Sequence, residues 1–184
     1  MNFIELITKR QSVRKYSDKA VEKEKVELCI EAARIAPSAS NSQPWKFIVV
    51  DKPELKNKVA NATFSKLVSF NKFALEAPII IAIVLEKPRL ITQVGGALKK
   101  KEFPLIDLGI TAEHFCLQAA EVGLGTCMLG WFNHKKIKNL LNIPKGKTIG
   151  LIITLGYAPE EYTQRQKIRK ETNIIMNYNT YSDK

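Results

Sequence analysis

The chain has 184 residues, 45% of them hydrophobic, which is enough for one sizeable core but short for two typical domains, so we expect a single domain over residues 1–184. Its formal net charge is +11, from 29 Lys and Arg against 18 Asp and Glu, which raises the possibility of a nucleic-acid-binding protein. The basic residues are scattered, however, and the run Lys99–Lys101 is closed by Glu102, so we expect no nucleic-acid partner.

The N-terminal part of the chain is predicted to contain two helices. Asn2 can cap a short helix with Phe3, Leu6 and Ile7 on its inner face. Apolar residues at helical spacing predict a second helix over residues 22–35, which ends before a proline.

Two strands and a third helix are predicted next. Residues 45–50 form an apolar strand, and Pro53 suits the first turn of a helix that extends to about Asn71, with Phe70 facing inward. The stretch over residues 79–85 is apolar on both faces and rich in β-branched residues. It is therefore predicted to be a buried strand in the centre of the sheet.

The second half of the chain begins with a long excursion over residues 86–104, which lacks periodicity and could cover a pocket. A strong helix follows from Ile106, and Gly123 is a natural cap at its end. The remaining elements are a strand or turn over 125–131, a short helix over 135–141 and an apolar strand over 148–157. The polar C-terminal segment holds a late apolar cluster at 174–176, which indicates an arm that packs on a partner.

Two stretches carry candidate binding residues. In an extended chain, Arg10, Ser12 and Arg14 share one side, and this set suits a phosphate because Arg offers a planar fork of donors to an anion. The loop over residues 36–45 is rich in Ser and Asn and contains two prolines, so it offers several hydrogen-bond donors to a ligand. A solvated charged edge and an ordinary connecting loop are the alternatives.

Five motifs occur in a fixed order along the chain. They are Arg10-x-Ser12-x-Arg14; Pro37-Ser38-x-x-Asn41-x-Gln43-Pro44-Trp45; Gly123-Leu124-Gly125-Thr126 followed by Gly130; Leu141-Asn142-Ile143-Pro144; and Gly156-Tyr157 ahead of Lys167-Ile168-Arg169. This ordered set resembles the FMN-dependent nitroreductase family, and the motifs together span most of the sequence.

The resemblance implies an α+β fold. It is a three-layer α/β/α arrangement with a mostly antiparallel central sheet, in a homodimer whose C-terminal arms are exchanged. The alternation of helices and strands alone would instead favour a parallel sheet.

The resemblance also assigns a set of residues to FMN. Arg10, Ser12, Lys167 and Arg169 would hold the phosphate and ribityl chain, and Arg14 would approach the N1 edge of the ring. The loop residues would come from the other subunit. The backbone of Met128, Leu129 and Gly130 would pass the ring, and Asn71 or Lys72 would reach its pyrimidine edge. The full set is Arg10, Gln11, Ser12, Arg14, Pro37, Ser38, Ala39, Ser40, Asn41, Asn71, Met128, Leu129, Gly130, Lys167 and Arg169.

The implied activity is an FMN-dependent NAD(P)H oxidoreductase that reduces nitroaromatics, quinones or similar small acceptors by a ping-pong hydride mechanism. The flavin carries the chemistry, so no catalytic side chain is expected. Alternatives are an enzyme of the same fold that fragments flavin or removes halogen, and a flavin-binding protein without turnover.

Other features indicate the compartment. The three cysteines are odd in number, widely spaced and set in apolar surroundings, which favours a reducing compartment over a disulfide framework. The longest apolar run is far shorter than the ~20 residues of a membrane span, and the N-terminus has no leader pattern. We therefore expect a soluble cytoplasmic protein with no membrane partner. His114 and His134 share no ligand spacing with the cysteines, so no metal site is expected.

Overall fold

The computed structural model describes residues 1–87 and 102–182. Its elements are α1 (Phe3–Lys9), α2 (Lys23–Arg34), the 3₁₀ turn η1 (Ala39–Asn41), β1 (Trp45–Val50), α3 (Pro53–Ala60), the 3₁₀ turn η2 (Lys72–Leu75), β2 (Ile79–Leu85), α5 (Phe103–Glu121), β3 (Gly125–Leu129), α6 (His134–Leu140), β4 (Thr148–Gly156) and α7 (Thr172–Ile175). Most of the predicted excursion, including the run Lys99–Lys101, lies outside the described residues.

The strands of the described residues form one sheet in the order β1-β2-β4-β3, and every neighbouring pair is antiparallel. The antiparallel prediction is therefore confirmed, and the parallel sheet that alternation alone would favour is wrong. β2 lies inside the sheet between β1 and β4, as its apolar sequence predicts.

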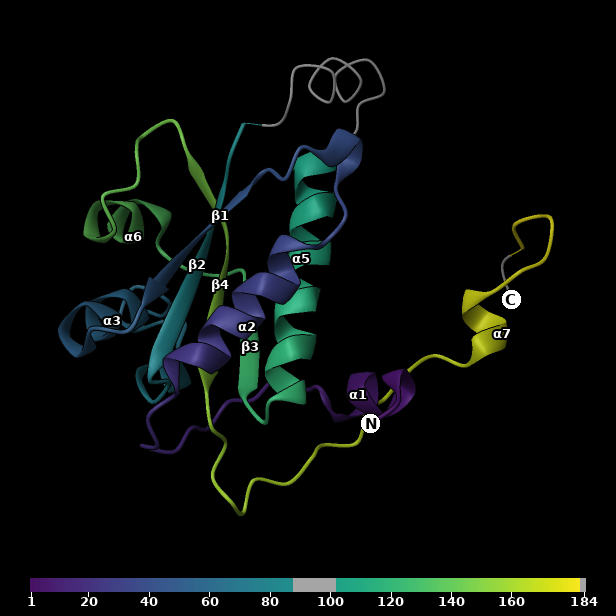
Figure 1. Cartoon of the computed structure of the whole chain (residues 1–184), viewed down its shortest axis with the longest axis horizontal. Helices are drawn as coiled ribbons and strands as arrows, with labels where there is room; N and C mark the ends of the chain where they lie inside the picture. Colours follow the sequence, from purple (N-terminus) through teal and green to yellow (C-terminus); the bar gives the residue numbers. More distant parts are fainter. Residues whose placement is uncertain (88–101, 183–184) are drawn as a thin grey trace.

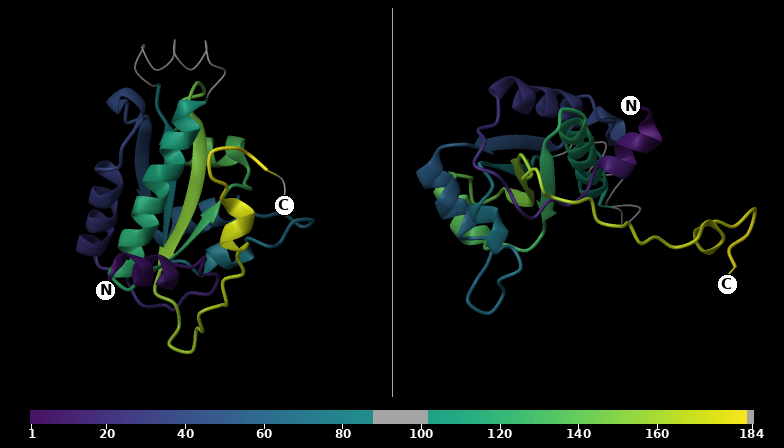
Figure 2. Two further views of the ribbon diagram at one scale, coloured as in Figure 1. Left: turned by 90° about the vertical axis from the view of Figure 1, so that its right-hand side faces the viewer. Right: turned by 90° about the horizontal axis from the view of Figure 1, so that it is seen from below.

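Helices cover both faces of this sheet, which gives the predicted three layers. Side chains alternate along a strand, so Ile79, Ile81 and Ile83 of β2 pack in one apolar cluster with residues of α2 and α5. The intervening residues of the same strand pack in a second cluster with residues of α3 and α6. Figures 1 and 2 show α2 and α5 on one side of the sheet and α3 and α6 on the other.

The N-terminal segment covers the outer edge of β3. Ser12 forms a parallel bridge with Thr126, and the Val13 N–H donates to the Thr126 carbonyl at 2.8 Å. Val13 is buried, and a Cβ placed on Gly125 would lie 2.7 Å from its Cγ2 atom. Glycine at position 125 thus lets the segment pack directly on the strand edge, which would otherwise expose unpaired backbone groups.

The predicted helix over residues 53–71 is too long, because α3 ends at Ala60. The Asn61 side chain donates to the Asn57 carbonyl at 2.9 Å, and the Thr63 hydroxyl donates to the Ala60 carbonyl at 2.8 Å. These bonds satisfy carbonyls that a continuing helix would use, so the chain leaves the helix there. Phe70 is 62% exposed, so its predicted inward orientation is wrong.

The predictions for the inner face of α1 and for the start of α5 are also wrong. The Asn2 cap is confirmed, with its side chain accepting from the Glu5 N–H at 2.9 Å, but Phe3 is exposed and Leu6 and Ile7 are only half-buried. α5 begins at Phe103 rather than Ile106, because a proline in its first turn costs no helical hydrogen bond.

The C-terminal segment leaves the body of the molecule. α7 and the residues after it extend away from the sheet and helices in Figure 1 and in the right-hand view of Figure 2. Ile174, Ile175 and Met176 are 48%, 69% and 45% exposed, so the apolar cluster has little cover within this chain. That it packs on a partner stays a prediction.

Replacing Gly125 by alanine should destabilise the fold. The added Cβ would force Val13 from its place, and overpacking of this kind typically costs about 1–3 kcal/mol. Gly109 is the matched control: it lies inside α5 with nothing within 4 Å of an added Cβ, so Gly109→Ala should stabilise by about 0.5–1 kcal/mol. Urea unfolding of both variants measures this, and equal stabilities would contradict the packing described.

Candidate functional site

A hollow of about 150 Å³ lies between a segment near the start of the chain and one that precedes the C-terminal arm. Its lining comes from two short segments far apart in the sequence, Arg10, Gln11, Ser12 and Arg14 from one and Arg165, Gln166, Lys167 and Arg169 from the other. The structure thus brings together the predicted basic residues of both chain ends.

The N-terminal segment is fixed by contacts of its side chains with β4 and α5. The Tyr16 hydroxyl donates to the Val13 carbonyl at 3.0 Å and lies 2.7 Å from the Thr154 hydroxyl oxygen. Burial raises the pKa of Tyr16 well above its ordinary value, so the phenol stays a neutral donor. Arg10 Nε lies 3.1 Å from Glu113 Oε1 of α5, with the geometry of an ion pair rather than of a hydrogen bond.

The C-terminal segment is tied to the N-terminal one by side-chain bonds. Lys167 Nζ donates to the Ile7 and Arg10 carbonyls, each at 2.5 Å. The Arg165 N–H donates to Gln11 Oε1 at 3.1 Å. The two Lys167 bonds cap the end of α1, whose last carbonyls need partners, and all three bonds join the two basic segments.

The hollow is strongly positive. Five of its eight lining residues are Arg or Lys, and none of the eight is acidic. Burial, reinforced by the charges of Arg10 and Arg169 and opposed by Glu113, lowers the pKa of Lys167. A bound anion would offset this mutual repulsion, so the site suits a phosphate better than a neutral group.

The loop over residues 37–41 is held elsewhere. Its turn η1 contains Ser40 and Asn41 in the left-handed region, at φ 52° and 51°, and the Ala39 N–H donates to Asp107 Oδ1 at 3.0 Å. Asp107 and Glu113 lie six residues apart on α5, about 9 Å along the axis. None of residues 37–41 lines the hollow, so a single chain does not bring this loop to it.

The remaining predicted residues gather at the end of β3. Leu129 is buried, Met128 is half-buried, and Gly130 is exposed with no atom within 4 Å of an added Cβ. Asn71 is buried, and its side-chain amide donates to the Thr63 carbonyl at 3.1 Å and to the Trp131 carbonyl at 3.0 Å. Asn71 is thus bonded to the residue that follows Gly130.

Arg165 and Gln166 line the hollow but were not predicted from the sequence. The signal was present, because Arg165, Lys167 and Arg169 alternate in the same way as Arg10, Ser12 and Arg14, and in extended chain such residues share one side.

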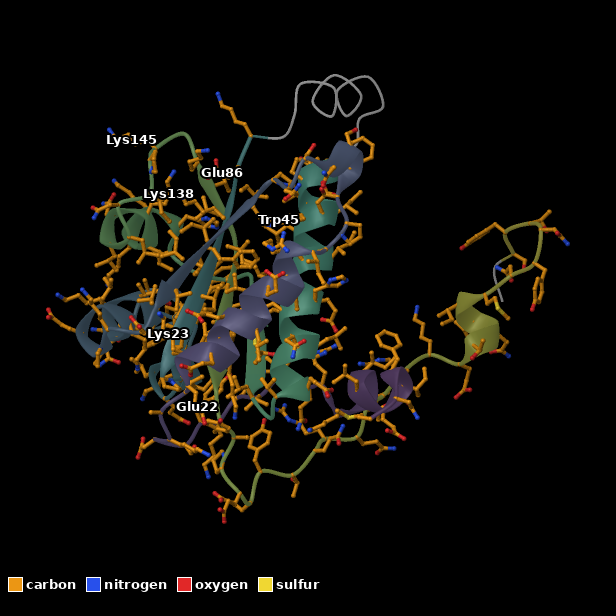
Figure 3. The ribbon with its side chains drawn as sticks, viewed as in Figure 1. Glu22, Lys23, Trp45, Glu86, Lys138 and Lys145 are labelled. Carbon is orange, nitrogen blue, oxygen red and sulfur yellow. The ribbon has the colours of Figure 1, made fainter. Side chains whose placement is uncertain are left out.

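Other charged side chains are distributed over the molecule. Glu22 and Lys23 lie at the start of α2, while Lys138, Lys145 and Glu86 lie toward the opposite end of the sheet (Figure 3).

Within residues 1–87 and 102–182, no group of three or more His, Cys, Asp or Glu could hold a metal ion. No helix within these ranges is long and apolar enough to cross a membrane.

Comparison with known proteins identifies the family. Residues 7–157 match the sequence profile of the Nitroreductase family, so the chain belongs to that family. A relative from Archaeoglobus fulgidus with the provisional name NADH dehydrogenase/NAD(P)H nitroreductase is 30% identical over 167 residues, which cover 86% of each chain. Iodotyrosine deiodinase 1 of Sus scrofa is 26% identical over 95% of this chain and 67% of its own.

A solved structure supports the same assignment. The FMN-dependent nitroreductase from Clostridium difficile R20291 superposes with a TM-score of 0.80 at 29% identity, covering 97% of this chain and 100% of that one. The α+β nitroreductase fold is thereby confirmed.

The thiols should be unreactive in the native protein. Cys29, Cys116 and Cys127 are free and buried, and burial raises the pKa of Cys29 and Cys116 to about 12. Burial also raises the pKa of Cys127, although Arg14, Ser12 and Arg165 oppose it. At pH 8, iodoacetamide should label the three thiols in urea and none in the native chain on the same timescale, because the thiolate is the nucleophile. Rapid native labelling of Cys127 would contradict this.

Proposed function

We propose that the chain is an FMN-dependent NAD(P)H oxidoreductase that reduces nitroaromatics, quinones or similar small acceptors. The observation that carries the proposal is the acid-free hollow with five basic residues, because it suits a single phosphate group. The names of the relative from Archaeoglobus fulgidus and of the structure from Clostridium difficile support the same activity.

The residues of the hollow fit FMN. Arg10, Lys167 and Arg169 would hold the phosphate, with Gln11 and Ser12 beside it, since charge-assisted bonds to an anion are roughly twice as strong as neutral ones. When bound, FMN supplies hydride and electron transfer by itself. The protein is then required to bind the cofactor, orient it and leave one face open.

Other residues would orient the ring. Arg14 follows Ser12 on the same side of the segment, so it would place a positive charge near the N1 edge. The backbone of Met128, Leu129 and Gly130 would pass the ring, and Gly130 has the open space that such an approach requires. Asn71 would lie at the pyrimidine edge.

The complete site would need two chains, each a single domain in a homodimer. Within one chain, η1 is anchored at the N-terminal part of α5, away from the hollow. We infer that Pro37, Ser38, Ala39, Ser40 and Asn41 serve the hollow of the partner subunit. The exposed apolar residues of the C-terminal arm would pack on that subunit, and the protein would act in the cytoplasm without a nucleic-acid partner.

A second candidate activity is removal of halogen from an aromatic substrate by the same site. The likeness to iodotyrosine deiodinase 1 favours it over flavin fragmentation and over flavin binding without turnover.

Purified protein should carry a yellow chromophore that is released as FMN. It should oxidise NADH or NADPH, and a nitroaromatic or quinone should accelerate that oxidation. Measuring iodide released from an iodinated phenol distinguishes the second candidate activity from the first, because only a dehalogenase releases iodide. A colourless protein that fails to bind FMN on titration would end the proposal.

Deleting residues 173–184 should abolish both dimerisation and FMN binding. The deletion takes away exposed apolar side chains, and burying each on a partner would contribute roughly 1.5–3 kcal/mol. The double variant Lys167→Gln, Arg169→Gln is the contrast: it should remain dimeric but bind FMN on the order of a hundredfold more weakly. Size-exclusion chromatography with flavin quantitation measures both, and a monomeric truncation with stoichiometric FMN would refute the shared site.

A further inference from the structure

Arg165 lines the hollow but belongs to none of the motifs that carry the resemblance to nitroreductases. We propose that Arg165 binds the FMN phosphate directly and that Tyr162 positions it for this task. The inference rests on the proposed function, because it concerns the same cofactor site.

The guanidinium of Arg165 is held on one side and open on the other. Its Nη2 atom donates to the Ser12 carbonyl at 3.2 Å and to the Tyr162 hydroxyl at 2.8 Å. These two bonds use both hydrogens of Nη2, while an arginine has five N–H donors in all. The three N–H of Nε and Nη1 therefore stay available to an acceptor in the hollow that this side chain lines.

The Tyr162 hydroxyl bonds to both segments that line the hollow, residues 10–14 and 165–169. Its hydroxyl accepts from Arg165 Nη2 and also from the Arg14 N–H, at 3.1 Å. One side chain thereby fixes the guanidinium of Arg165 against the backbone of the N-terminal segment. The neighbouring ion pair between Lys15 Nζ and Glu161 Oε1, at 3.2 Å, holds the same two segments together.

The Arg165 side chain is already ordered before a ligand binds, and this favours binding of a phosphate. A free arginine loses rotamer entropy when it binds an anion, whereas a guanidinium already held by two bonds has less freedom left to lose. Lys170 carries the same charge in the same segment but does not line the hollow. Charge at position 165 is therefore placed where a phosphate would contact it, and charge at position 170 is not.

The test compares FMN with riboflavin, which has the same ring and lacks the phosphate. Arg165→Gln should weaken FMN binding roughly 10- to 100-fold and leave riboflavin binding unchanged, because one charge-assisted interaction with the phosphate is lost. Tyr162→Phe should weaken FMN binding several-fold, again without effect on riboflavin. Arg165→Lys should recover part of the FMN affinity, and Lys170→Gln should bind both ligands like the unmodified protein.

Fluorescence titration of the apoprotein gives both affinities, and thermal unfolding of each variant reports its fold. Equal losses for FMN and riboflavin would overturn the inference, since a purely structural clamp affects both ligands alike. Unchanged FMN affinity in Arg165→Gln would overturn it as well, while the FMN-binding proposal would still stand. If the unmodified protein bound neither ligand, the proposed function itself would fail and this inference with it.

Discussion

The site depends on the backbone pairing between the N-terminal segment and the edge of β3. Ser12 and Val13 pair with Thr126, and the C-terminal basic segment then bonds to this N-terminal segment. The cationic side chains of residues 165–169 lie beside those of residues 10–14 because their segment bonds to the N-terminal segment, which itself pairs with that edge. A strand edge that would otherwise be exposed thus supports the proposed binding site.

Much of the fold is predictable because the pattern of apolar residues along a segment indicates which of its faces are buried. Ile79–Leu85 is apolar at every position, and a strand with this pattern must be covered on both faces, as β2 is. The end of α3 could not be predicted in the same way. The chain leaves the helix where Asn61 and Thr63 bond to backbone carbonyls, and Asn71 ties the following loop to Trp131, which is distant in sequence.

The candidate site could be predicted in part because its residues also follow a simple pattern along the chain. Alternation in extended chain selects Arg10, Ser12 and Arg14, and the same rule applied to the other chain end selects Arg165 with Lys167 and Arg169. The role of the 37–41 loop follows from no pattern within one chain, because η1 is anchored to Asp107 and lies away from the hollow. Its assignment to a partner's site rests on the resemblance and on this separation.

The central claim is that the hollow binds the phosphate of FMN, and phosphorus NMR of the bound cofactor tests it most directly. The second pKa of a phosphate ester is about 6, and nearby cations favour the dianion. The account predicts a bound resonance whose chemical shift stays constant between pH 5 and pH 8, because the cations hold the phosphate as the dianion. A bound resonance that titrates near pH 6, like that of free FMN, would contradict it.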